Sequence, residues 1–243
     1  MSRSDRRQFI TLSTKAFLAA QALLPLLAGC GSGSELTAAP PAPALLTWEQ
    51  LLARLRKLSE VQFTPGWDQE TQVRDVEAAL RIADLDCRQV REFCAAYKNS
   101  RSDFPEIRVM HEERSFQISL LEFEPGETIP LHDHPGMTGV AFCTEGEVEV
   151  KAYDPHGEIS NQRLWLKPRP AVIASPGLAV TLTATRGNIH SLKATRFTRM
   201  IDIFAPPYSR EIISRCRYYS PLGELNNEGL LETEVRLSPP AKT

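Results

Sequence analysis

Residues 130–139 have the sequence PLHDHPGMTG, which places two histidines, His132 and His134, just before a turn. In a β-strand, residues i and i+2 point to the same face, so both imidazoles project into one space while Asp133 points away. Two imidazoles on one face can share a metal ion. The spacing alone leaves open the alternative of two packed or exposed histidines.

A metal site with an open position needs a third donor, and three further histidines are available. His156 lies in the turn-forming sequence DPHG, which favours a solvated side chain. His111 lies near a strand end, where a structural or exposed role is favoured. His190, in RGNIHSL, follows a Gly-Asn turn and opens a strand that can lie beside the His132 strand. His190 is therefore the preferred third donor.

The region that carries these histidines has the pattern of β-structure. Short segments rich in β-branched and aromatic residues alternate with Gly, Pro and Asn/Asp turns. They cover residues 107–113, 115–124, 139–146, 147–154, 162–168, 171–177, 180–185, 189–194 and 198–207. Such spacing predicts a sandwich or barrel, most economically a double-sheet jelly roll. The sequence after Tyr219 has weaker periodicity, and we expect it to pack on the outside.

Upstream of this region the pattern is helical. Residues 47–61 place Leu51 and Leu55 at helical spacing behind Thr47, a candidate cap, and Pro65 breaks the pattern. Two further helical patterns cover residues 68–85, including Ile82, and residues 86–97.

The first thirty residues have the features of an export signal. A basic region contains Arg6 and Arg7 followed by Phe9, a moderately apolar stretch follows, and Leu-Ala-Gly-Cys ends at Cys30. The paired arginines resemble a bacterial twin-arginine signal, and the last four residues resemble a lipobox, whose cysteine is lipidated. We expect an exported bacterial protein of the periplasm or cell envelope, anchored to the membrane through lipidated Cys30. A plain signal peptide or an uncleaved anchor is the alternative.

The composition and net charge limit how many domains the chain can form and which kinds of partner it can bind. The 243 residues are 42% hydrophobic and 24% charged, as in a globular chain, and the formal net charge of -2 excludes the basic footprint of a nucleic-acid-binding protein. We expect a monomer with four parts: an export signal over 1–29, a flexible tether over 30–45, a helical segment over 46–100, and an all-β domain with a C-terminal extension over 101–243.

The spacing of glycines around the paired histidines adds a resemblance. Gly126 lies six residues before His132 and Gly146 lies twelve after His134, which resembles the first motif of the cupin superfamily. That motif usually continues with a glutamate ligand four or five residues after the second histidine. Thr138 and Gly139 occupy those places here, so the resemblance implies a site without its carboxylate.

Four motifs together resemble one family within that superfamily. IPLHDHPGMTG (129–139), RGNIHSL (186–192), IDIFAPPYS (201–209) and CRYY (216–219) are similar, in order and spacing, to the thiol dioxygenases that include plant cysteine oxidases and animal cysteamine dioxygenase. The resemblance covers roughly residues 46–220. It implies an all-β core, a cupin-type double-stranded β-helix (jelly roll), with N-terminal helices.

The resemblance also implies a cofactor and a reaction. One non-haem Fe(II) per chain is expected on His132, His134 and His190. Three neutral imidazoles leave the ion its full charge, which favours a bound thiolate. Both atoms of O2 end on sulfur and give a sulfinic acid. The expected substrate is cysteamine, another aminothiol or a peptide with an N-terminal cysteine.

The same resemblance implies roles for four residues outside the expected metal ligands. Asp202 is expected to orient a substrate amine or water, and Tyr208 to donate toward bound oxygen or substrate. Cys216 and Tyr218 resemble a pair that forms a thioether cross-link. For each, a structural role is the alternative: a carboxylate that accepts backbone donors, a core tyrosine with a satisfied hydroxyl, or buried packing.

Two other classes of function remain open. Three histidines and a water would suit Zn(II) and a hydrolytic reaction, because zinc lowers the pKa of bound water. A non-catalytic cupin that senses or binds a small ligand is the second alternative. The context of Asp202, PPYS and CRYY favours the dioxygenase.

Overall fold

The computed structural model describes residues 44–98 and 103–238. The expected export signal, most of the expected tether and the candidate lipidation residue Cys30 lie outside the described residues. None of the helices within the described ranges has both the length and the apolar character needed to cross a membrane.

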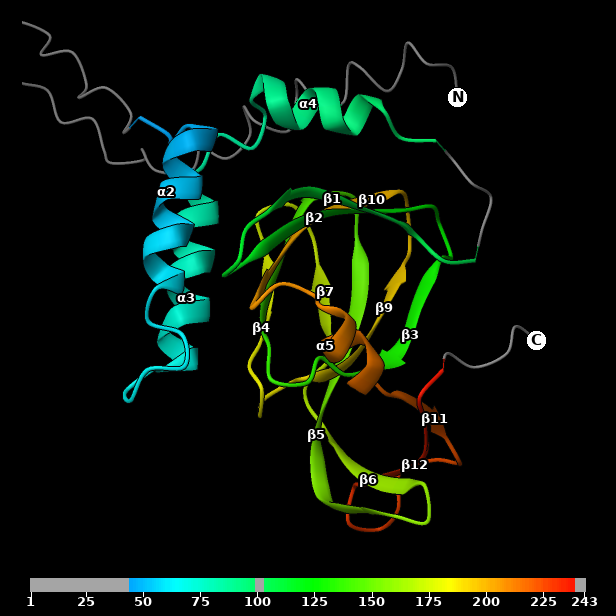
Figure 1. Cartoon of the computed structure of the whole chain (residues 1–243). Coiled ribbons are helices and arrows are strands. Elements are labelled where there is room, and N and C mark those ends of the chain that lie inside the picture. The colour runs from blue at the N-terminus through cyan, green and yellow to red at the C-terminus, as the bar shows by residue number, and fades with distance from the viewer. Residues whose placement is uncertain (1–43, 99–102, 239–243) are drawn as a thin grey trace, which may run out of the picture. The chain divides into compact units, whose positions relative to one another are not determined.

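Three helices precede the strands, as the periodicity predicts: α2 (Trp48–Ser59), α3 (Gln69–Arg81) and α4 (Arg88–Ala95) (Figure 1). α2 begins at the expected cap, Thr47. Its hydroxyl accepts the Gln50 N–H, while the Gln50 side chain accepts the Thr47 N–H. Asp68 caps α3 by accepting the N–H of Glu70. These caps fix where the two longer helices start.

The strands form two antiparallel sheets. The five-stranded sheet has the order β1-β2-β10-β4-β8 and consists of β1 (Glu106–Glu112), β2 (Gln117–Phe123), β4 (Thr138–Glu145), β8 (Ala179–Leu182) and β10 (Thr198–Ala205). The seven-stranded sheet has the order β6-β12-β11-β3-β9-β5-β7 and consists of β3 (Thr128–His132), β5 (Val148–Ser160), β6 (Arg163–Pro168), β7 (Val172–Ala174), β9 (Ile189–Ala194), β11 (Tyr218–Pro221) and β12 (Leu231–Arg236).

The winding of the strands confirms the predicted fold class. The chain alternates between the sheets from β2 to β5 and again from β7 to β10. Apolar side chains of both sheets, such as Phe123 and Met200 from one and Val148 and Ala194 from the other, fill the space between them. The fold is therefore a double-stranded β-helix with N-terminal helices.

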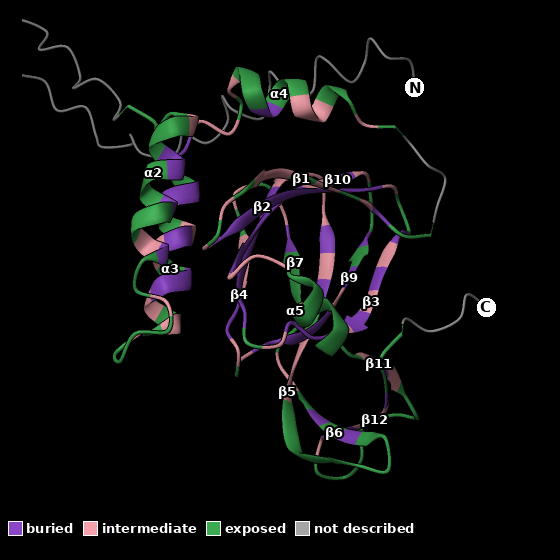
Figure 2. Cartoon of the chain, in the orientation of Figure 1, coloured by how far each residue is buried: buried purple, intermediate pink, exposed green. Residues whose placement is uncertain are grey.

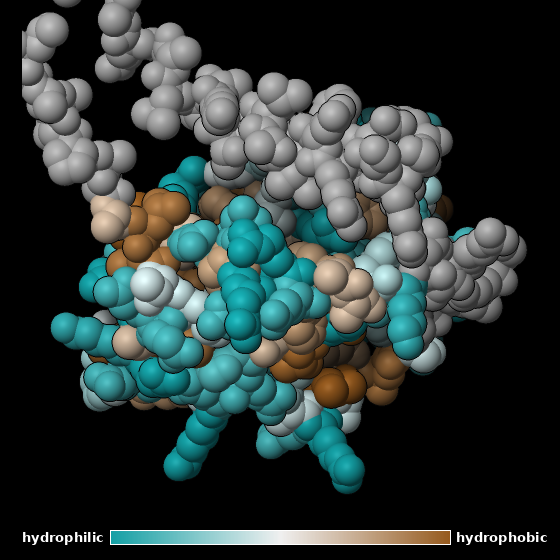
Figure 3. All heavy atoms as spheres, turned by 90° about the horizontal axis from the view of Figure 1, so that it is seen from above, coloured by the Kyte–Doolittle hydropathy of each residue, from teal (hydrophilic) through white to brown (hydrophobic). Residues whose placement is uncertain are grey.

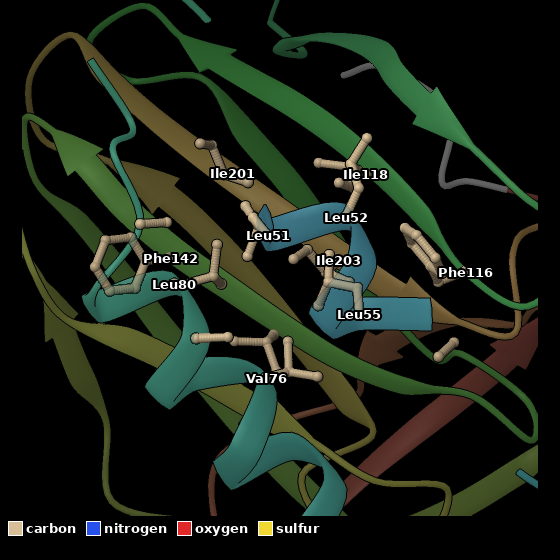
Figure 4. Close-up of a cluster of buried hydrophobic side chains, with 14 of the residues drawn as sticks. Leu51, Leu52, Leu55, Val76, Leu80, Phe116, Ile118, Phe142, Ile201 and Ile203 are labelled. Atoms are coloured by element: carbon tan, nitrogen blue, oxygen red, sulfur yellow. The ribbon is translucent and has the colours of Figure 1, made fainter. Parts of the chain in front are cut away.

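A second core lies on the outer face of the five-stranded sheet, where α2 and α3 cover it (Figure 4). Leu51, Leu55 and Leu80 of the helices pack with Ile118 and Ile203 of the strands. In Figure 2 the buried residues of both helices follow the side that faces the sheet. Because residues alternate along β10, Met200, Asp202 and Phe204 point to the interior of the sandwich instead.

Three sequence expectations differ from the structure. DPHG is not a turn, because residues 154–157 continue the long strand β5, although His156 is exposed as expected. The chain after Tyr219 does not merely pack outside, because β12 joins the sheet between β6 and β11 and buries Leu231. Ile82, expected within a helical pattern, is the exposed C-cap of α3.

Hydrophilic residues dominate the described part of the face seen in Figure 3, with smaller hydrophobic areas between them. Exposed apolar side chains of the described ranges include Ile107 and Val109 on β1 and Ile173 on β7. Folded proteins commonly expose apolar residues in this scattered way, and such residues need no partner to explain them.

Candidate metal centre

Three histidines meet at one end of the seven-stranded sheet. His132 is the last residue of β3, and in the antiparallel register it lies opposite His190 of β9. His134 follows two residues after the strand has ended. One ring nitrogen from each of the three residues lies within 4.8 Å of the others, and the Nε2 atoms of His134 and His190 are 3.0 Å apart. The three expected ligands therefore come together.

The protonation state of these imidazoles suits a cation. Burial lowers the pKa of all three residues, that of His132 to about 4, so the rings are neutral near pH 7. Nδ1 of His132 lies 2.7 Å from the Pro130 carbonyl oxygen. If Nδ1–H donates there, Nε2 is left with its lone pair. Neutral imidazole nitrogens that converge in this way fit a transition-metal ion such as iron, zinc or copper.

The structure also explains why the site has no carboxylate. A Cβ atom at Gly139 would lie 2.6 Å from Cε1 of Phe204, and the Phe204 ring stacks on His134 with its centroid 4.5 Å away. The neighbouring Thr138 donates its hydroxyl to the Ala205 carbonyl. The aromatic ring thus fills the space in which a carboxylate side chain from position 139 would lie.

Asp202 lies inside the sandwich, in the middle of β10. Its register neighbours are Ser119 of β2 and Ala141 of β4. No ion pair or hydrogen bond from the described residues, side chain or backbone, contributes to the pKa of its carboxyl group. Burial raises the pKa of Asp202 to about 8. The alternative of a carboxylate held by backbone donors therefore has no support here, and the group is available to a polar ligand.

Tyr208 lies behind a metal ligand. Its hydroxyl oxygen is 2.5 Å from Nδ1 of His134, and its ring packs against Phe204 with centroids 5.1 Å apart. Burial raises the pKa of Tyr208, so the phenol keeps its proton. If a metal ion binds Nε2 of His134, Nδ1 carries the ring proton and donates it to the Tyr208 oxygen. The phenol O–H can then donate to a second acceptor, so the expected role of Tyr208 toward bound oxygen or substrate stays a prediction.

Cys216 and Tyr218 flank the site on one side. Tyr218 lies opposite His132 in the pairing of β11 with β3, with ring centroids 6.2 Å apart. Cys216 follows α5 (Arg210–Arg215), is a free cysteine and directs its thiol to the Ile212 carbonyl. The cross-link between Cys216 and Tyr218 stays a prediction.

Two buried polar residues beside the histidines were not predicted to have a role in the site. Asp133 accepts hydrogen bonds from the Arg217 N–H and the Tyr219 hydroxyl, and Asn188 bonds the backbone of His134. Both line a groove of about 690 Å³ that none of the three histidines lines. Only weak signals in the sequence indicated these two residues. Strand alternation points Asp133 away from the paired histidines, and Asn188 belongs to an ordinary Gly-Asn turn sequence.

Comparisons with known proteins agree with the motifs. Plant cysteine oxidase 1 of Arabidopsis thaliana is 28% identical over 126 residues, which are 49% of this chain and 43% of that protein. The 2-aminoethanethiol dioxygenase of Homo sapiens is 26% identical over 190 residues, covering 67% of this chain and 69% of that protein. The chain thus spans less than half the length of the plant relative.

Solved structures also resemble the chain. An RmlC-like cupin protein from Desulfovibrio desulfuricans has a TM-score of 0.35 at 19% identity and covers 46% of this chain and 92% of that chain. Ectoine synthase from P. lautus has a TM-score of 0.34 at 19% identity and covers 44% of this chain and 68% of that chain.

A family model gives the broadest match. The PCO_ADO model matches residues 76–236, which is more than half of the chain and includes all three histidines, Asp202, Tyr208 and the Cys216–Tyr218 segment. The resemblance inferred from the four motifs is confirmed. The chain belongs to the PCO_ADO family.

Proposed function

We propose that this protein is an iron(II)-dependent thiol dioxygenase that converts a thiol and one O2 molecule into a sulfinic acid. The observation that carries the proposal is a cluster of three histidines, two of them buried and His132 partly buried, with no carboxylate among the ligand candidates of the described residues. The reaction balances without a further reductant, because both oxygen atoms are added to sulfur, which is oxidised as O2 is reduced.

Some residues of the site would bind the iron ion, and others would position those ligands. His132, His134 and His190 hold one iron ion, and their neutrality leaves its charge available to a thiolate. Iron(II), when bound, supplies the one-electron chemistry that O2 requires. The Phe204 ring against His134 keeps water away from that side of the site. With a metal ion on Nε2, His134 donates its Nδ1–H to the Tyr208 hydroxyl oxygen.

The inner face around Asp202 favours a thiol that also carries an amine. The residues that share this face on β2, β4 and β10 include Gln117, Ser119, Leu121, Ala141, Cys143, Met200 and Phe204. None is a lysine or arginine, so this part of the wall offers no cation to a substrate carboxylate. The buried Asp202 carboxyl group can instead pair with an ammonium group. We therefore propose a small aminothiol or a peptide with an N-terminal cysteine.

The test is O2 uptake by the anaerobically iron-loaded protein with cysteamine, cysteine, 3-mercaptopropionate and a Cys-initiated peptide. We expect uptake with an amine-bearing thiol and its loss in His190→Ala. The matched control is His156→Ala, which removes an exposed imidazole on β5. Stoichiometric iron without uptake on any thiol would contradict the proposal. Activity that requires zinc would support the hydrolytic alternative, and binding without turnover would support the sensing alternative.

We also propose that the protein is exported, lipidated at Cys30 and monomeric. The support for export and lipidation is the sequence of residues 1–30, with its paired arginines and Leu-Ala-Gly-Cys. Fractionation of cells that make the full chain should find it in the envelope, and a variant with Arg6→Lys and Arg7→Lys should stay in the cytoplasm. Cys30→Ala should abolish labelling by a palmitate analogue. Labelling that persists in Cys30→Ala would contradict the lipidation site.

The proposed monomer has its own test. Light scattering that gives twice the mass of one chain would contradict it.

A further inference from the structure

The position of His134 needs an explanation, because the sheet does not provide one. β3 ends at His132, whose register partners are His190 on one side and Tyr218 on the other. His134 lies beyond this last pair, in a loop that turns at Gly136. A metal ligand in a loop is held loosely unless side chains replace the hydrogen bonds that a neighbouring strand would provide.

Asn188 supplies the bonds that a neighbouring strand would supply. Its Oδ1 accepts the N–H of His134 at 2.8 Å, and its Nδ2 donates to the His134 carbonyl at 3.0 Å and to the Thr183 carbonyl at 2.9 Å. Both backbone polar groups of His134 thus bond one buried amide, and the His134 carbonyl also accepts the Met137 N–H of the following turn at 3.1 Å. Because Asn188 lies two residues before His190, it also links the backbone of one ligand to the strand that carries another.

Asp133 fixes the residue between the paired histidines from the other side. Its Oδ1 accepts the Arg217 N–H at 2.6 Å, its Oδ2 accepts the Tyr219 hydroxyl at 2.9 Å, and its own N–H donates to the Arg217 carbonyl at 3.1 Å. Asp133 is 7% exposed and Asn188 is 6% exposed. Two buried side chains therefore connect the ligand loop to β9 and to β11.

We propose that Asp133 and Asn188 form a ligand-loop clamp: two positioning residues, with the hydrogen bonds given above, that set the geometry of the three imidazoles and so the affinity for the metal ion. The inference rests on the metal-binding part of the proposed function. Partners that hold metal ligands in place typically change metal affinity by about 10- to 100-fold when they are removed.

The test uses Co(II), whose visible absorption reports ligand geometry without any turnover. The dissociation constant, measured against a competing chelator, should rise by about 10- to 100-fold in Asn188→Ala and Asp133→Ala, with a shifted Co(II) spectrum. Asp133→Asn keeps the acceptor for the Arg217 N–H and should restore most of the affinity. The matched control is Thr233→Val, which deletes a buried hydroxyl that donates to the Leu164 carbonyl outside the clamp.

A milder variant keeps the inference testable if the alanine variants do not fold. Tyr219→Phe removes only the hydroxyl that donates to Asp133. It should weaken Co(II) binding by about 2- to 10-fold, as expected for the loss of one hydrogen bond, and should shift the spectrum in the same direction as the alanine variants.

The outcomes separate this inference from the proposed function. Clamp variants that melt at lower temperature but bind Co(II) with the original affinity and spectrum would overturn the clamp, as would an equal loss of affinity in Thr233→Val. A protein that binds Co(II) normally, responds to the clamp variants and oxidises no thiol would contradict the dioxygenase proposal and leave the clamp supported.

Discussion

Asp202 combines deep burial with the absence of a partner in the described residues, and this gives the free energy of unfolding a defined pH dependence. An unfolded aspartate has its ordinary pKa of 3.8, whereas burial raises the pKa in the folded protein to about 8. Between these values the folded chain binds more protons than the unfolded chain. The contribution of Asp202 to the free energy of unfolding therefore falls as pH rises from about 4 to about 8.

Replacing Asp202 by asparagine removes this titration. In the metal-free protein, the free energy of unfolding of Asp202→Asn relative to the original chain should increase steadily from pH 4 to pH 8, by roughly 1.4 kcal/mol for each pH unit at most. The histidines titrate in both proteins, so their contributions cancel in the difference. Urea unfolding of both proteins at several pH values measures this difference in unfolding free energy. A difference that does not change with pH would show that the carboxyl group is not held in its protonated form.

Tyr208 allows a distinction between two roles. Because its hydroxyl contacts His134 Nδ1, Tyr208→Phe should weaken metal binding by about 10-fold. Tyr153→Phe, which removes a hydroxyl beside an apolar cluster on β5, should leave metal binding unchanged. If the hydroxyl instead served bound oxygen or substrate, turnover would fall in Tyr208→Phe while metal affinity stayed the same. Equilibrium metal titration together with steady-state kinetics separates these results.

Residue types and spacing predicted the three histidines but not what holds them. His-x-His on a strand and a late histidine after a turn were enough to select His132, His134 and His190, because coordination depends on donor chemistry that a sequence displays. Asp133 and Asn188 act through contacts with residues 54 to 86 positions away, and local patterns carry no signal of such distances.

Among the elements, α2 and α3 stabilise the sandwich without touching the histidines, because they cover the outer face of the five-stranded sheet. Leu55 of α2 is 1% exposed, so Leu55→Ala should cost about 2 to 5 kcal/mol of unfolding free energy. Val61→Ala, at a side chain that is 49% exposed, should change it by less than about 0.5 kcal/mol.

The Co(II) spectrum of Leu55→Ala should match that of the original protein, since the ligands lie on the other sheet. Chemical denaturation and the spectrum of the folded variant test both statements. A Leu55→Ala protein as stable as Val61→Ala would mean that the helices do not share a core with the sheet.

The observed element boundaries match those predicted from the sequence where local signals decide them. They differ from the prediction where pairing with a distant strand decides them. The Thr47 cap and the 3.6-residue period located α2, since both are properties of consecutive residues. DPHG has turn composition but lies in β5 because β6 pairs with it, His156 facing Trp165. β12 has a weak pattern of its own and gains its place from pairing with β6 and β11.

For the whole molecule, the alternation of many short strands predicted the sandwich, and the motifs predicted the family. What the sequence could not supply is the strand order: β12 lies between β6 and β11, although some 65 residues separate it from β6. Such pairings depend on burying apolar faces across the molecule. The proposed reaction, in which one protein-bound iron ion directs both atoms of O2 to a thiol, likewise depends on the whole assembled site.

The mass of the product formed under ¹⁸O2 by the iron-loaded full chain with cysteamine or a Cys-initiated peptide tests this reaction directly. We expect a sulfinic acid that carries two labelled oxygen atoms, formed by His156→Ala and absent with His190→Ala. A product with one or no labelled oxygen, or a disulfide in place of a sulfinic acid, would contradict it.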